Sequence, residues 1–216
     1  MKTKHPMRGL LTFSFHASLG NASLALLSSI VLLIVFLATG GVFFFNMLVI
    51  VSLLMVPMLV ISSMGDKDGK WERFQLTMPI KRGDLLGMQY LSVVVSLLIP
   101  IALVIGAIGI GPLLHEAPFD SAVSGILATL PALGMPFLMS GLFFPLATTK
   151  IGKGKETGLL TTCQFIAIAV ILLAPWASER LSISFYMVGA LIAAVSALVF
   201  LISYFIARVT YAKLDF

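Results

Sequence analysis

The charged segment 66–84, DKDGKWERFQLTMPIKRGD, holds the residues best suited to recognition chemistry. Residues 70–77 can form a short helix on which Trp71 and Phe74 share one face and charged side chains occupy the others. Pro79 would end this helix, because proline disfavours helical geometry in the residue before it. Aromatic anchors with charged neighbours suit the docking of a soluble protein. The same helix could instead rest on lipid headgroups, with Trp71 as its anchor.

The remaining polar residues offer little catalytic chemistry. His115, Glu116 and Asp120 lie close together in the sequence, but a solvated turn explains them better than a metal site. Each of the three Gly-Lys pairs lacks the Ser or Thr and the preceding glycine of a phosphate-binding loop, so ATP is not expected to bind this chain in that way. The single cysteine, Cys163, is expected to be a small buried apolar residue.

The composition predicts that lipid surrounds most of the chain. Of its 216 residues, 59% are hydrophobic and only 11% are charged. A soluble domain carries about 25% charged residues. A water-soluble fold could not hide so much apolar surface, which indicates an all-α integral membrane protein.

Long intervals without Asp, Glu, Lys or Arg define the membrane spans. A spanning helix needs about 20 apolar residues. The longest interval is divided at Thr39-Gly40-Gly41, where two glycines permit a tight helical hairpin. Asp84 can cap the third span, Gly111-Pro112 can end it, and three prolines should bend or break the fourth. The predicted spans are about 22–39, 42–63, 85–110, 122–148, 157–176 and 183–207.

Two further elements lie on the expected cytoplasmic face of this single domain, residues 1–216. Apolar residues recur at helical spacing over 6–20, opposite Arg8, Thr12 and His16. This pattern predicts an amphipathic helix that lies in the membrane interface. The second element is the short helix within a cytoplasmic loop over 64–84.

The basic residues predict the orientation of the chain. Of its 14 Lys and Arg residues, only Arg180 falls on the side opposite the rest. By the positive-inside rule, both termini are then cytoplasmic. The net charge of +5 is therefore explained by topology, and binding of nucleic acid is not expected.

Two sequence segments resemble a known family of transporters. Matching residues in and after the charged loop are Trp71, Glu72, Thr77, Pro79, Ile80, Arg82 and Tyr90. A second match follows the fourth span, with Phe144-Pro145-Leu146, then Ile151-Gly152 and Lys155. Together they resemble small six-span ABC type-2 exporter permeases, including those of phenol-soluble modulin and antimicrobial peptide exporters. Gln89 departs from the pattern, because members of the family often have Lys there.

The resemblance implies a permease that has no catalytic activity of its own. A separate ATP-binding subunit would hold ATP and Mg and dock on the cytoplasmic loops. A second permease chain, identical or related, would complete a bacterial exporter in the inner (plasma) membrane. Its cargo would be an amphipathic peptide or a lipid-like molecule. The implied docking residues are Asp68, Lys70, Trp71, Glu72, Arg73, Phe74, Gln75, Thr77, Pro79 and Arg82, with Lys150, Gly152, Lys153, Lys155 and Glu156 in the second cytoplasmic loop.

Two other functions remain open from the sequence. One is a non-transporting immunity or sensor protein that binds a peptide or recruits a partner. The other is a membrane enzyme, which the absence of buried acid–base groups disfavours. Small residues on the spans could pack within this chain or against a second one. These are Gly106, Gly109, Ala190, Ala193, Ala194 and Ala197.

Overall fold

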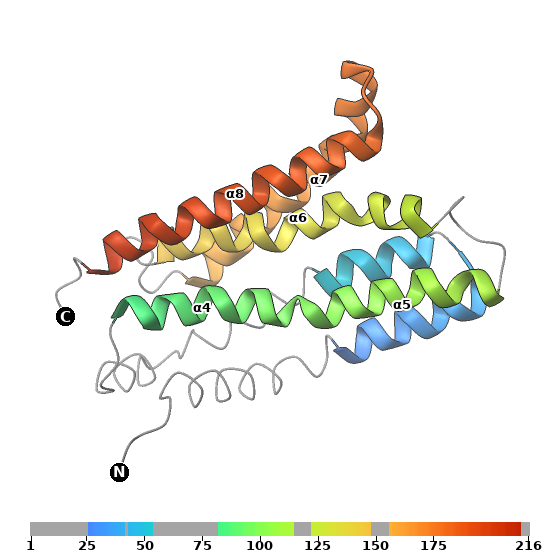
Figure 1. The fold of residues 1–216 in the computed structure, drawn as a ribbon, viewed down its shortest axis with the longest axis horizontal. Helices are drawn as coiled ribbons and strands as arrows, with labels where there is room; N and C mark the ends of the chain where they lie inside the picture. The colour runs from blue at the N-terminus through green and yellow to red at the C-terminus, as the bar shows by residue number, and fades with distance from the viewer. Residues whose placement is uncertain (1–25, 42, 54–81, 115–121, 148–155, 213–216) are drawn as a thin grey trace, which may run out of the picture.

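The computed structural model describes residues 26–41, 43–53, 82–114, 122–147 and 156–212 (Figure 1). Within these ranges helix is the only regular secondary structure, and the predicted all-α fold is confirmed. The helices are Leu26–Thr39, Phe43–Leu53, α4 (Arg82–Ser96), α5 (Leu98–Leu114), α6 (Ala122–Ala147), α7 (Glu156–Leu181) and α8 (Phe185–Ala212).

Four of the helical stretches are long and apolar enough to cross a membrane. They are Leu86–Leu114, Val123–Ala147, Gly158–Leu181 and Phe185–Thr210. A helix satisfies its own backbone hydrogen bonds, which is why helices can span lipid. Leu26–Thr39 and Phe43–Leu53 are shorter apolar helices, and the second adjoins residues outside the described ranges. The count of six spans, the cytoplasmic termini and the interfacial helix over 6–20 stay predictions, and the last lies outside those ranges.

A tight turn at Gly40 ends the first described helix. Gly40 has a φ of 66°, a left-handed conformation that favours glycine. Its N–H donates a hydrogen bond to the Phe36 carbonyl at 2.8 Å, which caps the helix end. The rings of Phe36 and Phe45 then meet with their centroids 5.5 Å apart. The left-handed turn at Gly40 and the contact between the two rings therefore support the helical hairpin that the sequence predicts.

One span comprises α4 and α5, with an interruption at Leu97. Backbone hydrogen bonds cross the interruption, from Leu97 to the Val93 carbonyl and from Ile101 to the Leu97 carbonyl. Pro100 has no N–H to donate to the carbonyl of Ser96, so the helix loses one bond there. The helix then continues to Leu114, past Gly111-Pro112, where the sequence predicts an end.

The central helix of the molecule is α6. It contains Pro131, Pro136 and Pro145, yet it is one continuous helix from Ala122 to Ala147, so the break that the prolines suggest is absent. Prolines are tolerated in membrane helices because neighbouring helices compensate for the lost bonds. Here α8 and α7 pack along α6, which is the most buried of the four spanning stretches.

Small residues bring α6 and α8 close together. A methyl group on Gly189 would lie 2.7 Å from Cγ of Pro131, and one on Gly141 would lie 3.1 Å from the Phe200 backbone. One on Gly134 would lie 3.2 Å from the Cα of Ala193. A methyl group at Gly189 would clash with Pro131, and methyl groups at Gly141 and Gly134 would require the facing backbone to shift by a few tenths of an ångström. This pair is therefore held by close backbone approach, as is common between membrane helices.

A short connection joins α7 to α8 at the far end of the bundle. The helix α7 runs through Pro175 to Leu181, beyond the predicted end of the fifth span at 176. Ser182 has a φ of 53°, and the N–H of Ile183 donates to the Ser178 carbonyl at 3.1 Å. Figure 1 shows this orange junction standing away from the axis of the other helices.

Candidate functional site

Most of the predicted docking residues lie outside the described ranges. Only Arg82 and Glu156 fall inside them, as the first residues of α4 and α7. Asp84, predicted as a cap, lies within the first turn of α4, where a carboxylate favours the positive end of the helix dipole. The residues outside the described ranges are Asp68, Lys70, Trp71, Glu72, Arg73, Phe74, Gln75, Thr77, Pro79, Lys150, Gly152, Lys153 and Lys155.

The helix ends that flank these loops gather at one end of the bundle. Figure 1 shows the start of α4 beside the end of α8, with the end of α6 and the start of α7 near them. The described turn at Gly40 and the α7–α8 junction lie at the opposite end. We call the end of the bundle that holds the start of α4 and the end of α8 the loop end. Both segments that carry the family resemblance therefore lead into the same region.

An aromatic cluster joins three helices near the loop end. We define it as Tyr90 of α4, Phe144 of α6, and Phe200 and Tyr204 of α8. The Tyr90 ring centroid lies 4.5 Å from that of Phe144, 4.9 Å from that of Phe200 and 5.3 Å from that of Tyr204. Aromatic pairs at these separations attract each other. The structure thus brings together Tyr90 and Phe144, one from each resemblance segment.

The buried Tyr90 hydroxyl makes a defined hydrogen bond within the cluster. It lies 2.9 Å from Oγ of Ser203 on α8. Ser203 donates its single hydroxyl proton to the Phe200 carbonyl at 2.8 Å. Because that proton is used, Tyr90 must be the donor to Ser203. Both side chains are almost fully buried, so a relay of two hydrogen bonds fastens α4 to the backbone of α8.

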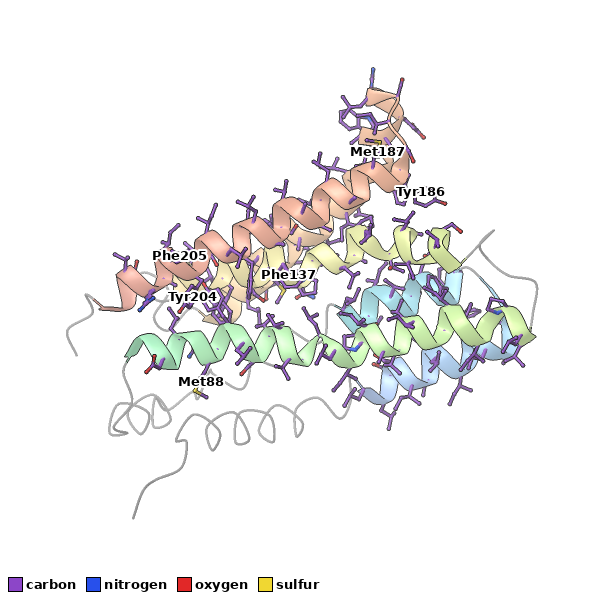
Figure 2. All side chains as sticks on the ribbon, viewed as in Figure 1. Met88, Phe137, Tyr186, Met187, Tyr204 and Phe205 are labelled. Atoms are coloured by element: carbon purple, nitrogen blue, oxygen red, sulfur yellow. The ribbon has the colours of Figure 1, made fainter. Side chains whose placement is uncertain are left out.

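The first turns of α4 also lie close to α8. A methyl group on Gly87 would lie 3.6 Å from the Tyr204 hydroxyl oxygen, and one on Gly83 would lie 3.5 Å from Nε of Arg208. Figure 2 shows Tyr204 on the side of α8 that faces α4, and Phe205 on the outer side, where it is exposed. The helix α4, which follows the predicted cytoplasmic loop over 64–84, therefore lies along α8 from its first turn.

Tyr90 and Phe144 were marked in the sequence only as matches to the family pattern, and their partners on α8 were not predicted. Phe200, Ser203, Tyr204 and Ala207 recur at the spacing of one helical face. Ser203 and Tyr204 are also two adjacent polar positions in a mainly apolar span. From the sequence, we expected the alanines of this span to pack against other helices. Of these, Ala193 packs against α6, whereas Ala190 and Ala194 do not belong to the buried core.

Cys163 lies on the inner face of α7. It is buried, as expected, beside other inward-facing positions such as Leu160 and Ala167. These residues recur at helical spacing and belong to the hydrophobic core around α6. The cysteine is therefore a packing residue in this structure.

The fold and the site define a multi-pass helical membrane protein without a nucleotide-binding domain among the residues described. A family model for ABC-2 family transporter proteins matches residues 16–212. The chain belongs to this family, which makes it the membrane permease of an ABC transporter, and permeases of this kind work with an ATP-binding subunit. Comparisons with curated proteins and with solved structures found no match.

Proposed function

We propose that this chain is the permease subunit of an ABC exporter. It moves an amphipathic peptide or a lipid-like molecule out of the cytoplasm. A separate subunit binds ATP and Mg, hydrolyses the ATP and docks on residues 66–84 and 150–156. Movement of the docked subunits is passed to the spans through the helices that begin or end at these loops.

The aromatic cluster is the observation that best supports this proposal. A permease without its own ATPase needs a connection from its docking surface to its spans. Tyr90 lies two helical turns into α4 and contacts Phe144 at the end of α6 and Phe200 on α8. Force applied at the loop end would reach all three helices at this point.

The outer surfaces of the bundle support a lipid environment and a second permease chain. Large apolar side chains are exposed along α7 and α8, including Phe165, Leu172, Leu191 and Phe205. On α5, a methyl group added to Gly106 or Gly109 would meet no atom of the described residues within 4 Å, so we propose that this face contacts lipid or another chain. We propose that a second, identical or related permease completes the transport path.

The proposed orientation places the loop end in the cytoplasm. Arg208 lies at that end of α8, whereas Arg180 lies at the α7–α8 junction with its guanidinium carbon 5.8 Å from the centre of the Trp176 ring. Trp residues are common at membrane–water interfaces. The junction would then lie at the external interface, and both chain termini would be cytoplasmic.

Reconstitution tests the proposal against a non-transporting role. The permease and its ATP-binding subunit would be placed together in lipid vesicles, and ATP hydrolysis would be measured with and without an amphipathic helical peptide. An exporter predicts faster hydrolysis with the peptide and ATP-dependent movement of a fluorescently labelled peptide. Binding of the peptide without either effect would favour a sensor or immunity role and contradict the proposal.

A further inference from the structure

The strongest unexplained feature of the site is a hydroxyl pair buried among aromatic rings. Phenylalanine would fill the space of Tyr90 and keep its ring contacts, yet this position carries a hydroxyl group that must find a partner when buried. The partner is Ser203, whose hydroxyl already bonds to its own helix. Ser203 therefore accepts a bond from another helix without losing its local one.

The two parts of the α4–α5 span have different neighbours. The described contacts of α4 are mainly with α8, while α5 contacts α6 and approaches the N-terminal hairpin, where the Phe36 ring would lie 3.1 Å from a methyl on Gly111. The interruption at Leu97 separates them. Because Pro100 removes one backbone bond there, α4 can change its angle relative to α5 at low cost.

We propose that Tyr90 is a positioning residue that makes α4 move together with α8 when the ATP-binding subunit acts on the loop end. When α4 moves, the hydrogen bond from Tyr90 to Ser203 makes α8 move with it. Without this bond, α4 would bend at the interruption near Leu97 and α8 would stay in place. The inference rests on the proposed function, since it assigns a role within that coupling.

A spectroscopic readout at the far end of α8 tests this role directly. The chain has one cysteine, so Cys163→Ala followed by Ser182→Cys provides a single attachment point at the exposed α7–α8 junction. An environment-sensitive fluorophore at that position would report movement of the junction. The complete complex in vesicles would be measured without nucleotide and with ATP plus vanadate.

Two variants and one control separate coupling from stability. Tyr90→Phe keeps the aromatic ring, and Ser203→Ala keeps the helix backbone. Each substitution removes one of the two hydroxyl groups that form the hydrogen bond between α4 and α8. Ser92→Ala is the matched control on the same helix, because the Ser92 hydroxyl donates to the Met88 carbonyl of its own helix. Thermal unfolding and recovery of the ATP-binding subunit would be recorded for every variant.

The expected result is a nucleotide-driven fluorescence change in the parent protein and in Ser92→Ala. Nucleotide shifts the equilibrium between two positions of the α7–α8 junction. Tyr90→Phe and Ser203→Ala should each reduce this shift in the equilibrium constant by about two- to tenfold, the range expected for one neutral hydrogen bond. The double variant should lose no more than either single variant, because both remove the same bond.

Other outcomes would overturn the positioning role of Tyr90, or both this role and the proposed function. A full fluorescence change in Tyr90→Phe, with the subunit still bound, would overturn the positioning role and leave the permease assignment intact. A parent complex that binds the ATP-binding subunit but shows no nucleotide-driven change would overturn the role as well. Failure of the parent to bind any ATP-binding subunit would overturn the proposed function and this inference with it.

Discussion

Glycines have opposite surroundings in the α6–α8 pair and on the outer face of α5, which carries Gly106 and Gly109. Glycines on α6 and α8 lie where an added methyl group would press on the facing helix, most severely at Gly189 against the Pro131 ring. An added methyl group at Gly106 or Gly109 on α5 would meet none of the described residues within 4 Å. A glycine in a membrane helix therefore indicates close packing only when another helix is present to fill its space.

This difference divides the molecule mechanically. The α6–α8 pair has little room to rearrange, because backbone meets backbone over several turns. The α4–α5 span is interrupted at Leu97, and its two parts have different neighbours. We infer that the pair acts as a rigid body, and that relative motion is concentrated in the α4–α5 span.

The largest expected effect comes from filling the tight contact. Gly189→Ala places a methyl group against the Pro131 ring and should lower the free energy of unfolding by roughly 3 kcal/mol, the upper range for overpacking. The matched control is Gly109→Ala, where space is open and helix propensity should raise stability by up to about 1 kcal/mol. Unfolding in mixed detergent micelles measures both, and equal effects would remove the distinction between the two regions.

A somewhat smaller loss of stability is expected at the aromatic cluster, where α4 contacts α6 and α8. Phe144→Ala removes the ring that contacts Tyr90 and should cost roughly 2 kcal/mol, less than in a soluble core because lipid supplies part of the lost apolar environment. Leu146→Ala, at an exposed position two residues further on, is the control. If both variants unfold alike, the aromatic cluster does not hold α6 to α4.

A substitution at the interruption between α4 and α5 should raise the stability of the protein instead of lowering it. Pro100→Ala restores an N–H that can bond to the Ser96 carbonyl, which should contribute about 1 kcal/mol of stability, and the loss of the buried proline ring offsets part of this gain. Transport should nevertheless slow, since a continuous helix resists the change of angle between α4 and α5. Faster or unchanged transport with a more stable protein would show that no motion is needed there.

The smallest effect is expected at the α7–α8 junction. Trp176→Ala removes the ring beneath Arg180, an exposed cation–π contact worth about 0.5–1 kcal/mol. The unfolding transition should shift only slightly, and Leu173→Ala on the same exposed surface provides the reference. A loss as large as that of Gly189→Ala would mean that the junction belongs to the rigid part.

Much of the fold could be predicted because lipid imposes simple rules. Charge-free intervals indicated the spanning helices, and Gly40 marked the hairpin turn. Helix ends were less predictable, because Pro112 and Pro175 each remove only one backbone bond and the helices continue past them. The continuity of α6 through Pro131, Pro136 and Pro145 depends on tertiary packing, which no local pattern reveals.

The site was only half predictable for a related reason. Tyr90 and Phe144 stand out because they accompany recognisable loop motifs. Ser203 and Tyr204 lie in an apolar span, where a hydroxyl usually bonds to its own helix, as Thr210 does with the Ile206 carbonyl. Only the packing of α4 on α8 distinguishes Ser203 from such a residue.

The most direct measurement of the central claim is recovery of the ATP-binding subunit with this permease. Affinity purification would compare the parent chain with the Trp71→Ala, Glu72→Lys double variant, after both are shown to insert in the membrane equally. If the subunit docks on residues 66–84, the parent should retain the subunit and its ATP hydrolysis, and the double variant should lose both. Equal recovery and equal transport by the two proteins would contradict docking on residues 66–84.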